Sequence, residues 1–296
     1  MSAISHPAAD RPVVRSEAEL LMERESRVCF ASVTHSLNGA SLVAHSWQLK
    51  GDEFLLRGTG DNYFYYRKAA GITIDRGADA DLGEEQLWLN GSVYAAIASI
   101  NGLMPIHASA VAHNGSVYAF TGPSGAGKST LVAALGKHGM PMFCDDTLIL
   151  DIADPSNIVA LPGHKRLKLT SEALGVTGAS PEEKVSTRIE KFYARPPAGE
   201  VRKSLPLRKL IFLEEGPEPS ISDVLGAERF NRLQDDHYTA YLFESASTLD
   251  PRARFERFGR LAAGISMARF ERPRDVKRLD EGVALAEQFI RRQAAP

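Results

Sequence analysis

The stretch Gly122-Pro123-Ser124-Gly125-Ala126-Gly127-Lys128-Ser129-Thr130 decides how the rest of the chain is interpreted. It fits the phosphate-binding loop pattern G-x-x-x-x-G-K-[ST] at every constrained position. The glycines allow successive backbone N–H groups to turn toward an anion, Lys128 can reach the outer phosphates, and the Ser129 hydroxyl can ligate Mg²⁺. The predicted nucleotide-binding residues are Gly122, Ser124, Gly125, Ala126, Gly127, Lys128, Ser129 and Thr130.

Strand and helix signals flank this loop. Residues Ser116–Thr121 (SVYAFT) are apolar and aromatic, which is typical of a buried strand entering the loop. Residues Ser129–His138 (STLVAALGKH) have the apolar spacing of a helix, and Gly139 supplies a stop. This order directs the N-terminus of the helix at bound phosphates. The alternative, a glycine-rich turn with a solvated lysine, does not account for the agreement.

The composition is that of an ordinary globular protein. The 296 residues are 44% hydrophobic and 24% charged, enough for one large domain or one domain plus an appendage. The formal net charge of −2 argues against a general nucleic-acid binder, which would need a basic face. The two cysteines form no disulfide framework, and no leader or membrane-length apolar run is present. We therefore expect a cytoplasmic protein that binds neither nucleic acid nor membrane.

The first 84 residues differ in character from the rest. Short β-rich segments are separated by Asn-Gly, Gly-Asp and Gly-Thr-Gly turns, at residues 28–33, 41–49, 53–57 and 71–74. We predict a small β-rich region at residues 1–84 and a phosphate-loop domain at residues 85–296. The aromatic cluster Tyr63–Tyr66 is interpreted as core or interface packing, with a recognition surface as the alternative.

Further elements are predicted from the spacing of apolar residues and from the positions of Gly and Pro. Residues 84–101 have helical apolar spacing, although Gly91 costs about 1 kcal/mol inside a helix. A strand is expected at residues 205–214. The polar, proline-containing stretch 181–197 is interpreted as a long mobile loop that could close over a substrate. More helices are expected at residues 223–234, 251–263 and 273–290.

A hairpin before the loop has a register that can be worked out. Two β-like runs, Ile106–His113 and Ser116–Thr121, are separated by Asn114-Gly115, a strong two-residue turn signal. With that turn, Val111 faces Tyr118, and the same counting places His107 opposite Gly122. The pairing would therefore deliver His107 to the mouth of the phosphate loop. An imidazole there could contact phosphate or polarise a carboxylate, although a structural histidine is the alternative.

An acidic pair follows the helix. Asp145 and Asp146 end an apolar run that begins at Pro141, and the chain between Lys128 and Asp145 has room only for the helix and a turn. The pair should therefore end the next strand, at the edge of the sheet beside the phosphates. Two adjacent carboxylates repel each other unless a metal or a proton intervenes. We expect one to hold Mg²⁺ and the other to accept a proton from an attacking hydroxyl, without assigning which.

The succession HASAVAHNGSVYAFTGPSGAGKSTLVAALGKHGMPMFCDDTLIL, residues 107–150, resembles the kinase core of the HPr kinase/phosphorylase family. That family phosphorylates a protein serine, uses a fold also seen in phosphoenolpyruvate carboxykinases, and commonly forms oligomers. The resemblance implies an α/β fold with a phosphate-loop kinase core, ATP and Mg²⁺ as cofactors, and a peptide or protein substrate. The implied catalytic residues are His107, Lys128, Asp145 and Asp146, and the implied metal-binding residues are Ser129, Asp145 and Asp146.

The chain also departs from this family. The glycine-rich, metal-contacting signature downstream of the acidic pair has no clear copy, and the large N-terminal domain is absent. The chain more closely resembles shorter HPr-kinase-like proteins, some of which are associated with lasso-peptide gene clusters and phosphorylate a precursor peptide. Residues 161–209 carry 11 Lys/Arg against 5 Asp/Glu. Lys165, Arg166 and Lys168 are the predicted substrate-side cations, with a solvated face as the alternative.

A second basic stretch lies near the C-terminus. Residues 252–278 contain nine Arg/Lys. We interpret them as the polar sides of helices, with a phosphate contact from Arg272 or Arg274 as the alternative.

The sequence therefore predicts an ATP- and Mg²⁺-dependent serine kinase acting on a peptide or protein, with a lasso-peptide precursor as one candidate. Two alternatives stay open. The first is a kinase of a small-molecule hydroxyl, and the second is a nucleotide-driven switch or ATPase in which water attacks. No LSGGQ-like signature accompanies the loop, which argues against a transport ATPase.

Overall fold

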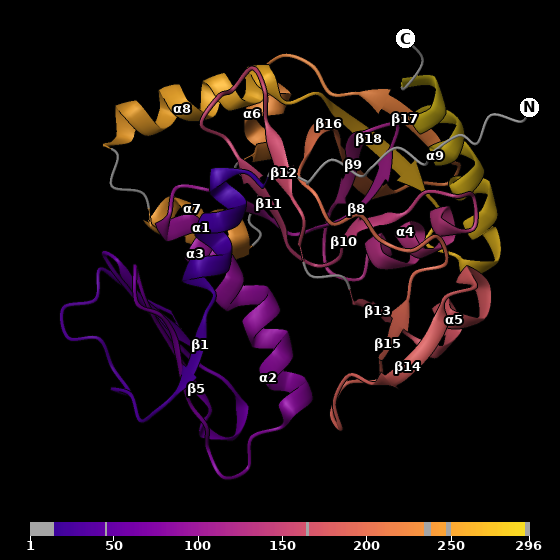
Figure 1. Ribbon diagram of the computed structural model, residues 1–296. Helices are drawn as coiled ribbons and strands as arrows, with labels where there is room; N and C mark the ends of the chain where they lie inside the picture. Colours follow the sequence, from indigo (N-terminus) through magenta and orange to yellow (C-terminus); the bar gives the residue numbers. More distant parts are fainter. Residues whose placement is uncertain (1–14, 45, 164–165, 234–237, 247–249, 294–296) are drawn as a thin grey trace, which may run out of the picture.

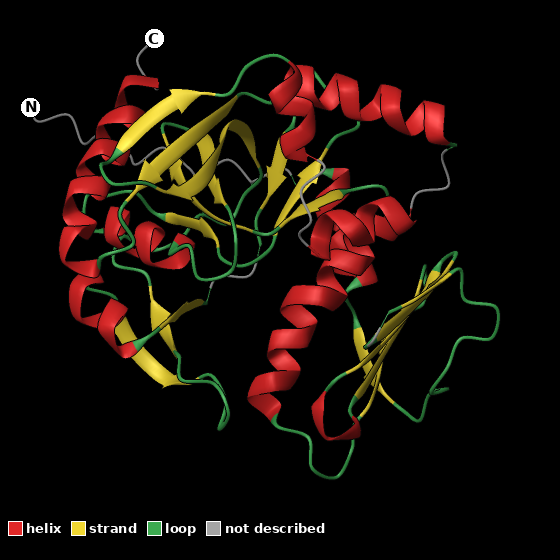
Figure 2. Ribbon diagram, turned by 180° about the vertical axis from the view of Figure 1, so that it is seen from behind, coloured by secondary structure: helices red, strands yellow, loops and turns green. Residues whose placement is uncertain are grey.

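A computed structural model describes residues 15–44, 46–163, 166–233, 238–246 and 250–293. Within these ranges the chain has a mixed α/β architecture with three β-sheets (Figures 1 and 2). Lys165, one of the predicted substrate-side cations, lies outside the described residues.

The largest sheet carries the phosphate loop. Along it the strands lie in the order β10-β8-β9-β16-β12-β11-β7. Outside this order, β18 pairs with both β16 and β17. Neighbours β9, β16 and β18 are parallel, so their carboxyl ends meet at one edge. The strands are β7 (Met104–Ile106), β8 (Ala108–His113), β9 (Ser116–Thr121), β10 (Met142–Cys144), β11 (Leu148–Asp151), β12 (Val159–Leu161), β16 (Leu205–Glu215), β17 (Ser220–Asp223) and β18 (Met267–Arg272).

Alternation along β9 gives this sheet two buried faces. Tyr118 and Phe120 pack in one hydrophobic core with α4 and α9, whereas Val117 and Ala119 pack in another with α6, α7 and α8. Figure 2 shows helices on both sides of the sheet. These helices are α4 (Lys128–Gly136), α6 (Ala227–Leu233), α7 (Tyr238–Ala246), α8 (Pro251–Gly264) and α9 (Leu279–Gln293). Burial on both sides makes the carboxyl edge of the sheet a rigid support for a site.

The N-terminal sheet lies beside a long helical stretch (Figure 1). Its strands are β1 (Val28–Phe30), β2 (Leu42–Val43), β3 (Trp47–Lys50), β4 (Glu53–Arg57), β5 (Tyr63–Arg67) and β6 (Gly71–Asp75). Helix α1 (Glu17–Glu25) packs with it. The aromatic cluster is core, as predicted, because Phe64 and Tyr66 have 0% exposure and the Tyr66 hydroxyl donates to Glu25.

The predicted helix at residues 84–101 is present with an irregularity at its weak point. Helix α2 (Leu82–Trp88) continues through a π-helical turn at Leu89–Val93 into α3 (Tyr94–Ile100). This turn contains Asn90 and Gly91, and Gly91 is the residue that lowers the stability of a regular helix here. Val93 and Ile97 share a core with Phe64, but also with Ile149 and Leu161 of the large sheet. The boundary near residue 84 stays a prediction.

The stretch predicted as a mobile loop at 181–197 instead contains two strand segments, at residues 181–184 and 192–195. Strands β13 (Leu167–Leu169), β15 (Phe192–Arg195) and β14 (Ser180–Lys184) form a third sheet, and α5 (Ser171–Thr177) lies between β13 and β14. We call residues 167–195 the arm. The prediction was wrong because the strand pairing of this polar segment depends on Leu167 and Leu169, which are buried under α4 and are distant in sequence.

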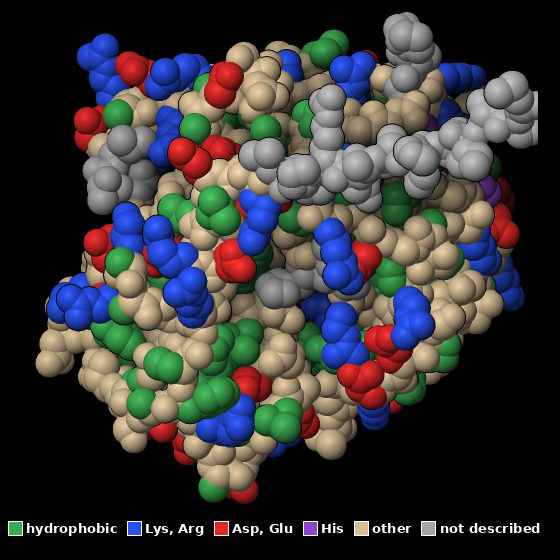
Figure 3. Space-filling model, in the orientation of Figure 1, with side chains coloured by type: hydrophobic (Ala, Val, Ile, Leu, Met, Phe, Trp, Pro, Cys, Tyr) green, Lys and Arg blue, Asp and Glu red, His purple; other side chains and the backbone are tan. Residues whose placement is uncertain are grey.

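On the described surface shown in Figure 3, Lys and Arg side chains are interspersed with Asp and Glu side chains. In the described part of the chain, no helix combines the length and the apolarity that crossing a membrane requires.

Candidate functional site

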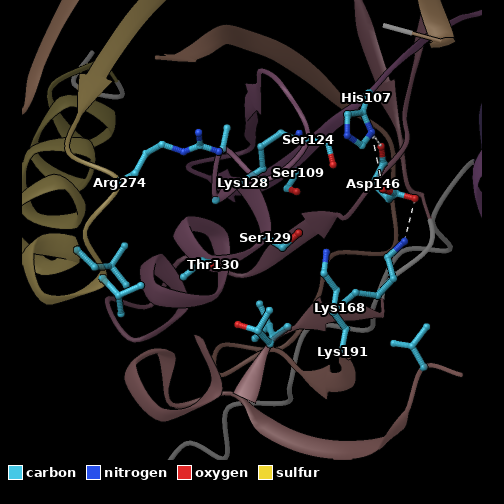
Figure 4. Close-up of a pocket in the computed structure, with 18 of the residues that line it drawn as sticks. His107, Ser109, Ser124, Lys128, Ser129, Thr130, Asp146, Lys168, Lys191 and Arg274 are labelled. Carbon is cyan, nitrogen blue, oxygen red and sulfur yellow. Dashed lines mark hydrogen bonds and ion pairs between the residues drawn. The ribbon is translucent and has the colours of Figure 1, made fainter. Parts of the chain in front are cut away.

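The loop with the phosphate-binding sequence pattern, which we call the phosphate loop, follows β9 and leads into α4, and it opens onto a cavity of about 400 Å³ (Figure 4). The loop, the start of β8, the turn after β10, the arm and the β18–α9 connection all contribute to its wall. Its lining includes His107, Ser109, Ser124, Gly125, Ala126, Gly127, Lys128, Ser129, Thr130, Asp146, Lys168, Lys191, Arg272 and Arg274. Residues that lie more than half the chain apart in sequence, such as His107 and Arg274, therefore share one pocket.

Two glycines of the loop are required by space as well as by backbone conformation. Gly127 has a φ of 83°, and a Cβ there would lie 2.5 Å from the Arg272 guanidinium. Gly122 has a φ of 144°, and a Cβ would lie 2.8 Å from the Leu213 carbonyl oxygen of β16. The loop therefore packs directly against the ends of β16 and β18.

Lys128 is buried and held by its own loop. Its Nζ donates to the carbonyl oxygens of Gly122 at 2.8 Å and Pro123 at 3.1 Å. Its exposure is only 6%, so water competes little for the ammonium group. The cation lies at the N-terminus of α4, where the helix dipole also favours an anion.

The predicted hairpin register is confirmed. His113 pairs with Ser116 and Val111 with Tyr118, and the last pair is Ala108 with Thr121, one step before His107 and Gly122. The run from Ile106 to His113 is not one strand, however. Residues before His107 form β7, which pairs with β11, whereas residues after it form β8, between β9 and β10. His107 lies at this break, and the Thr121 hydroxyl donates to its carbonyl oxygen at 3.1 Å.

Asp145 connects three segments of the site. Its Oδ1 accepts hydrogen bonds from Ser129 Oγ at 2.7 Å and Ser109 Oγ at 2.5 Å. Its Oδ2 accepts from the backbone N–H of Lys168 at 3.2 Å. Asp145 is 3% exposed, so these donors replace the water that an ionised carboxylate would otherwise bind. The phosphate loop, β8 and the arm are thereby tied to one carboxylate.

Asp146 differs from its neighbour because it faces the cavity. Its φ of 74° is a left-handed conformation that non-glycine residues rarely adopt. His107 Nδ1 lies 3.0 Å from the Asp146 carbonyl oxygen and 3.7 Å from its Oδ1. Lys168 Nζ lies 2.8 Å from Oδ2 (Figure 4). His107 and Lys168 therefore hold the Asp146 carboxylate in the position that its left-handed backbone conformation sets.

The charges around Asp146 set its protonation. Burial alone would raise the pKa of the Asp146 carboxyl, but Lys168, His107 and Lys128 outweigh it and hold the pKa below its usual value of 3.8. For Lys168, burial lowers the pKa, whereas Asp146 and Asp145 raise it, and the net pKa is raised. Asp146 is therefore a carboxylate and Lys168 an ammonium at neutral pH.

The donor set fits a hard cation such as Mg²⁺. The Ser129 hydroxyl and the Asp145 carboxylate already lie within hydrogen-bond distance, and both supply the oxygen ligands that Mg²⁺ prefers. Among the described residues, no group of three or more His, Cys, Asp or Glu side chains could hold a metal by itself. A Mg²⁺ bound here would therefore take its remaining ligands from phosphate oxygens and water.

Of the predicted substrate-side cations, the structure brings Lys168 into the site and Arg166 away from it. Arg166 pairs with Glu182 and Glu183, and its guanidinium lies 3.7 Å from the centre of the Tyr193 ring. Arg166 precedes β13 and does not line this cavity, so the structure does not bring it together with Lys168, and its role as a substrate-side cation stays a prediction.

Sequence reasoning missed two residues of this site and left a third open. Ser109 lines the cavity and binds Asp145, and its only signal was its position two residues after His107. Lys191, in the turn before β15, extends into the cavity beside Lys168 (Figure 4). Arg272, offered only as an alternative to a solvated helix face, is buried beside the loop.

Comparison with known proteins finds likenesses among solved structures only. No protein-family model matches the chain, and no curated protein matches it. Among solved structures, the chain is similar to the HPr(Ser) kinase/phosphatase from Coxiella burnetii, with 14% identity and a TM-score of 0.34. The alignment covers 64% of this chain and 89% of that chain. A TM-score this low does not establish a shared fold, so the family resemblance of the sequence stays a prediction.

Proposed function

We propose that the protein transfers the γ-phosphoryl group of ATP to a hydroxyl, with a serine of a peptide or protein as the acceptor. The observation that carries this proposal is the position of Asp146. Its carboxylate lines the same cavity as Lys128 and Ser129 and is held there by His107 and Lys168. A phosphate loop facing a fixed carboxylate is the arrangement that hydroxyl phosphorylation needs.

Nucleotide binding would rest on the loop itself. The backbone N–H groups from Gly125 to Thr130 surround the N-terminus of α4 and can cradle the phosphates. Lys128 can neutralise the outer phosphates once its Nζ exchanges its two hydrogen bonds to loop carbonyl oxygens for contacts with phosphate oxygens. Mg²⁺, when bound, neutralises phosphate charge, and Ser129 and Asp145 are the residues that would hold it.

The chemical step would use Asp146. An acceptor hydroxyl oxygen beside this carboxylate attacks the γ-phosphorus, its proton passes to an Asp146 carboxylate oxygen, and the bond to the β–γ bridging oxygen breaks as ADP leaves. His107 orients Asp146 through the carbonyl contact, and Lys168 keeps the carboxylate ionised until the proton arrives. We therefore assign the proton-accepting role to Asp146 and the metal-side role to Asp145.

The acceptor side favours a polar, anionic partner. Lys168 and Lys191 both enter the cavity from the arm, and Leu87, Val185 and Ile189 add an apolar wall. A peptide segment with an acidic and an apolar residue near its serine would match this surface, and a lasso-peptide precursor is one candidate. A small-molecule acceptor or water would instead leave the apolar wall without a partner.

The test follows radioactive phosphate from [γ-³²P]ATP and Mg²⁺ in the presence of a serine-containing peptide library. We expect label on peptide with the wild-type chain and none with Asp146→Asn, whereas Asp154→Asn, in an exposed loop, should behave as wild type. Label on inorganic phosphate alone would support the ATPase or switch. Label on a small molecule from a metabolite pool would support the small-molecule kinase.

A further inference from the structure

Arg272 ends β18 at the edge of the sheet that carries the phosphate loop. It pairs in register with Glu215 of β16, and β16 in turn pairs Phe212 with Thr121, the last residue before the loop. Because these strands are parallel, the end of β18 and the start of the loop lie at the same edge. Arg272 is therefore adjacent to the loop although it lies far from it in sequence.

The guanidinium of Arg272 is buried without a counter-charge. The residue is 7% exposed. Its Nη2 donates to the Ala126 carbonyl oxygen at 2.8 Å, Nη1 lies 3.5 Å from the Pro273 carbonyl oxygen, and Nε has no hydrogen-bond partner. In the part of the chain that the structure describes, no Asp or Glu side chain forms an ion pair with it.

Arg269 of the same strand shows the contrast. Its guanidinium forms ion pairs with Glu214 at 3.4 Å and Glu228 at 2.5 Å. Both arginines come from β18, yet only Arg269 has carboxylate partners.

A buried cation of this kind is unfavourable unless an anion joins it. Arginine does not lose its proton in proteins, so the charge stays. Burial lowers the pKa of the Arg272 guanidinium, and the nearby positive charge of Arg274 lowers it further. The local environment is therefore arranged for a negative group that is not part of the protein.

The surroundings keep this guanidinium against the loop. A Cβ on Gly127 would lie 2.5 Å from Arg272 Nη2, and a Cβ on Gly282 of α9 would lie 3.3 Å from Arg272 Cδ. The missing side chains leave room for the guanidinium on one side and for its aliphatic stem on the other. Arg272 lines the cavity together with Gly125, Ala126 and Gly127.

We propose that Arg272 binds the phosphate chain of the nucleotide, as a second cation beside Lys128. This inference rests on the nucleotide-binding part of the proposed function and adds to it a phosphate-binding residue that comes from outside the loop. Its planar fork can give one donor to Ala126 and the others to phosphate oxygens. Arg274, which lies 3.6 Å from the exposed Glu215, would be a weaker cation at the edge of the cavity.

Calorimetric titration of ADP and of adenosine tests this proposal without any turnover. We expect Arg272→Met to weaken ADP binding by about 10- to 100-fold, the loss expected for a charge-assisted contact, and to leave adenosine binding unchanged. Arg269→Met is the matched control and should bind ADP as wild type does. In thermal melts, ADP should raise the melting temperature of Arg272→Met less than that of wild type.

The result that overturns the proposal is an unchanged ADP affinity in folded Arg272→Met, or an equal loss of ADP and adenosine binding. Should Arg272→Met not fold, Arg272→Lys replaces it, because it keeps the charge and removes the planar fork. Unchanged ADP affinity in that variant would also overturn the proposal. The two proposals can fail separately. If Arg272→Met loses affinity for ADP but not for adenosine, while the wild-type protein labels no peptide, the Arg272 contact is supported and the kinase is rejected.

Discussion

Lys168 Nζ lies 2.8 Å from Asp146 Oδ2, although the two residues are 22 positions apart in sequence. Their side chains are 17% and 30% exposed, so the ion pair is only partly screened by water. The backbone N–H of the same lysine donates to Asp145. One residue of the arm therefore fixes both carboxylates of the acidic pair.

Removing this cation should change how activity depends on pH. Because Lys168 helps to hold the Asp146 pKa below its usual value, Lys168→Met should raise that pKa and move the acidic limb of kcat/KM to higher pH. Lys168→Arg, which keeps the positive charge, should leave the limb in place. The measurement is the pH–rate profile of the three proteins, and superimposable profiles for Lys168→Met and wild type would reject the coupling.

The same pair predicts a sensitivity of folding to acid. A carboxyl whose pKa is depressed in the folded state stabilises the protein fully above its unfolded-state pKa of 3.8, and this stabilisation is lost as the pH falls through the lower folded-state pKa. Asp146→Asn cannot show this loss. Urea unfolding between about pH 6 and pH 2 should therefore show a steeper loss of stability in wild type than in Asp146→Asn. Parallel curves would contradict the shift.

Lys128→Met should nearly abolish phosphoryl transfer. Electrostatic groups that contact the transferred charge typically contribute about 10²–10³-fold in kcat. Met keeps most of the buried side-chain volume, which matters because Lys128 is 6% exposed. Transfer assays beside a thermal melt give the test, and a folded variant with the wild-type rate would reject the phosphate-loop interpretation.

The two aspartates should respond differently to amidation. Asp145→Asn should raise the Mg²⁺ concentration needed for half-maximal rate, because Asp145 is hydrogen-bonded to Ser129, its partner in the proposed Mg²⁺ site. Asp146→Asn should lower kcat by about 10²–10⁴-fold at every Mg²⁺ concentration, since it removes the proton acceptor. Magnesium titrations of both variants measure this. The opposite assignment of effects would exchange the roles, and two wild-type rates would reject the pair altogether.

His107→Ala should lower kcat by about 10²–10⁴-fold with little change in nucleotide affinity, because the imidazole orients Asp146. His113→Ala, at the other end of β8, is the matched control and should retain the wild-type rate. Near-normal kcat in folded His107→Ala would show that this histidine is structural.

A related variant tests the hairpin register. Inserting one Gly after Asn114 should slip β8 by one position, move His107 away from the loop, and reduce both kcat and melting temperature. Retention of full activity would show that the position of His107 does not depend on the turn.

The sequence by itself determined the strand–loop–helix unit, the hairpin register and the strand end that carries Asp145. These features depend on contacts between near neighbours: glycines with positive φ, a two-residue turn, and apolar periodicity. Their chemistry can be read from residue type and spacing because the chain leaves few geometries for such short connections.

Tertiary structure alone decided which distant residues meet at that loop. Lys168 enters the cavity from β13, which pairs with β15, whereas Arg166 lies just before β13 and pairs with Glu182 and Glu183 of β14 outside the cavity. Arg272 reaches the loop because β18 is parallel to β16, and the different roles that we propose for Asp145 and Asp146 rest on their contacts with Ser129, His107 and Lys168. Long-range strand pairing is set by the summed packing of both sheet faces, which no local pattern encodes.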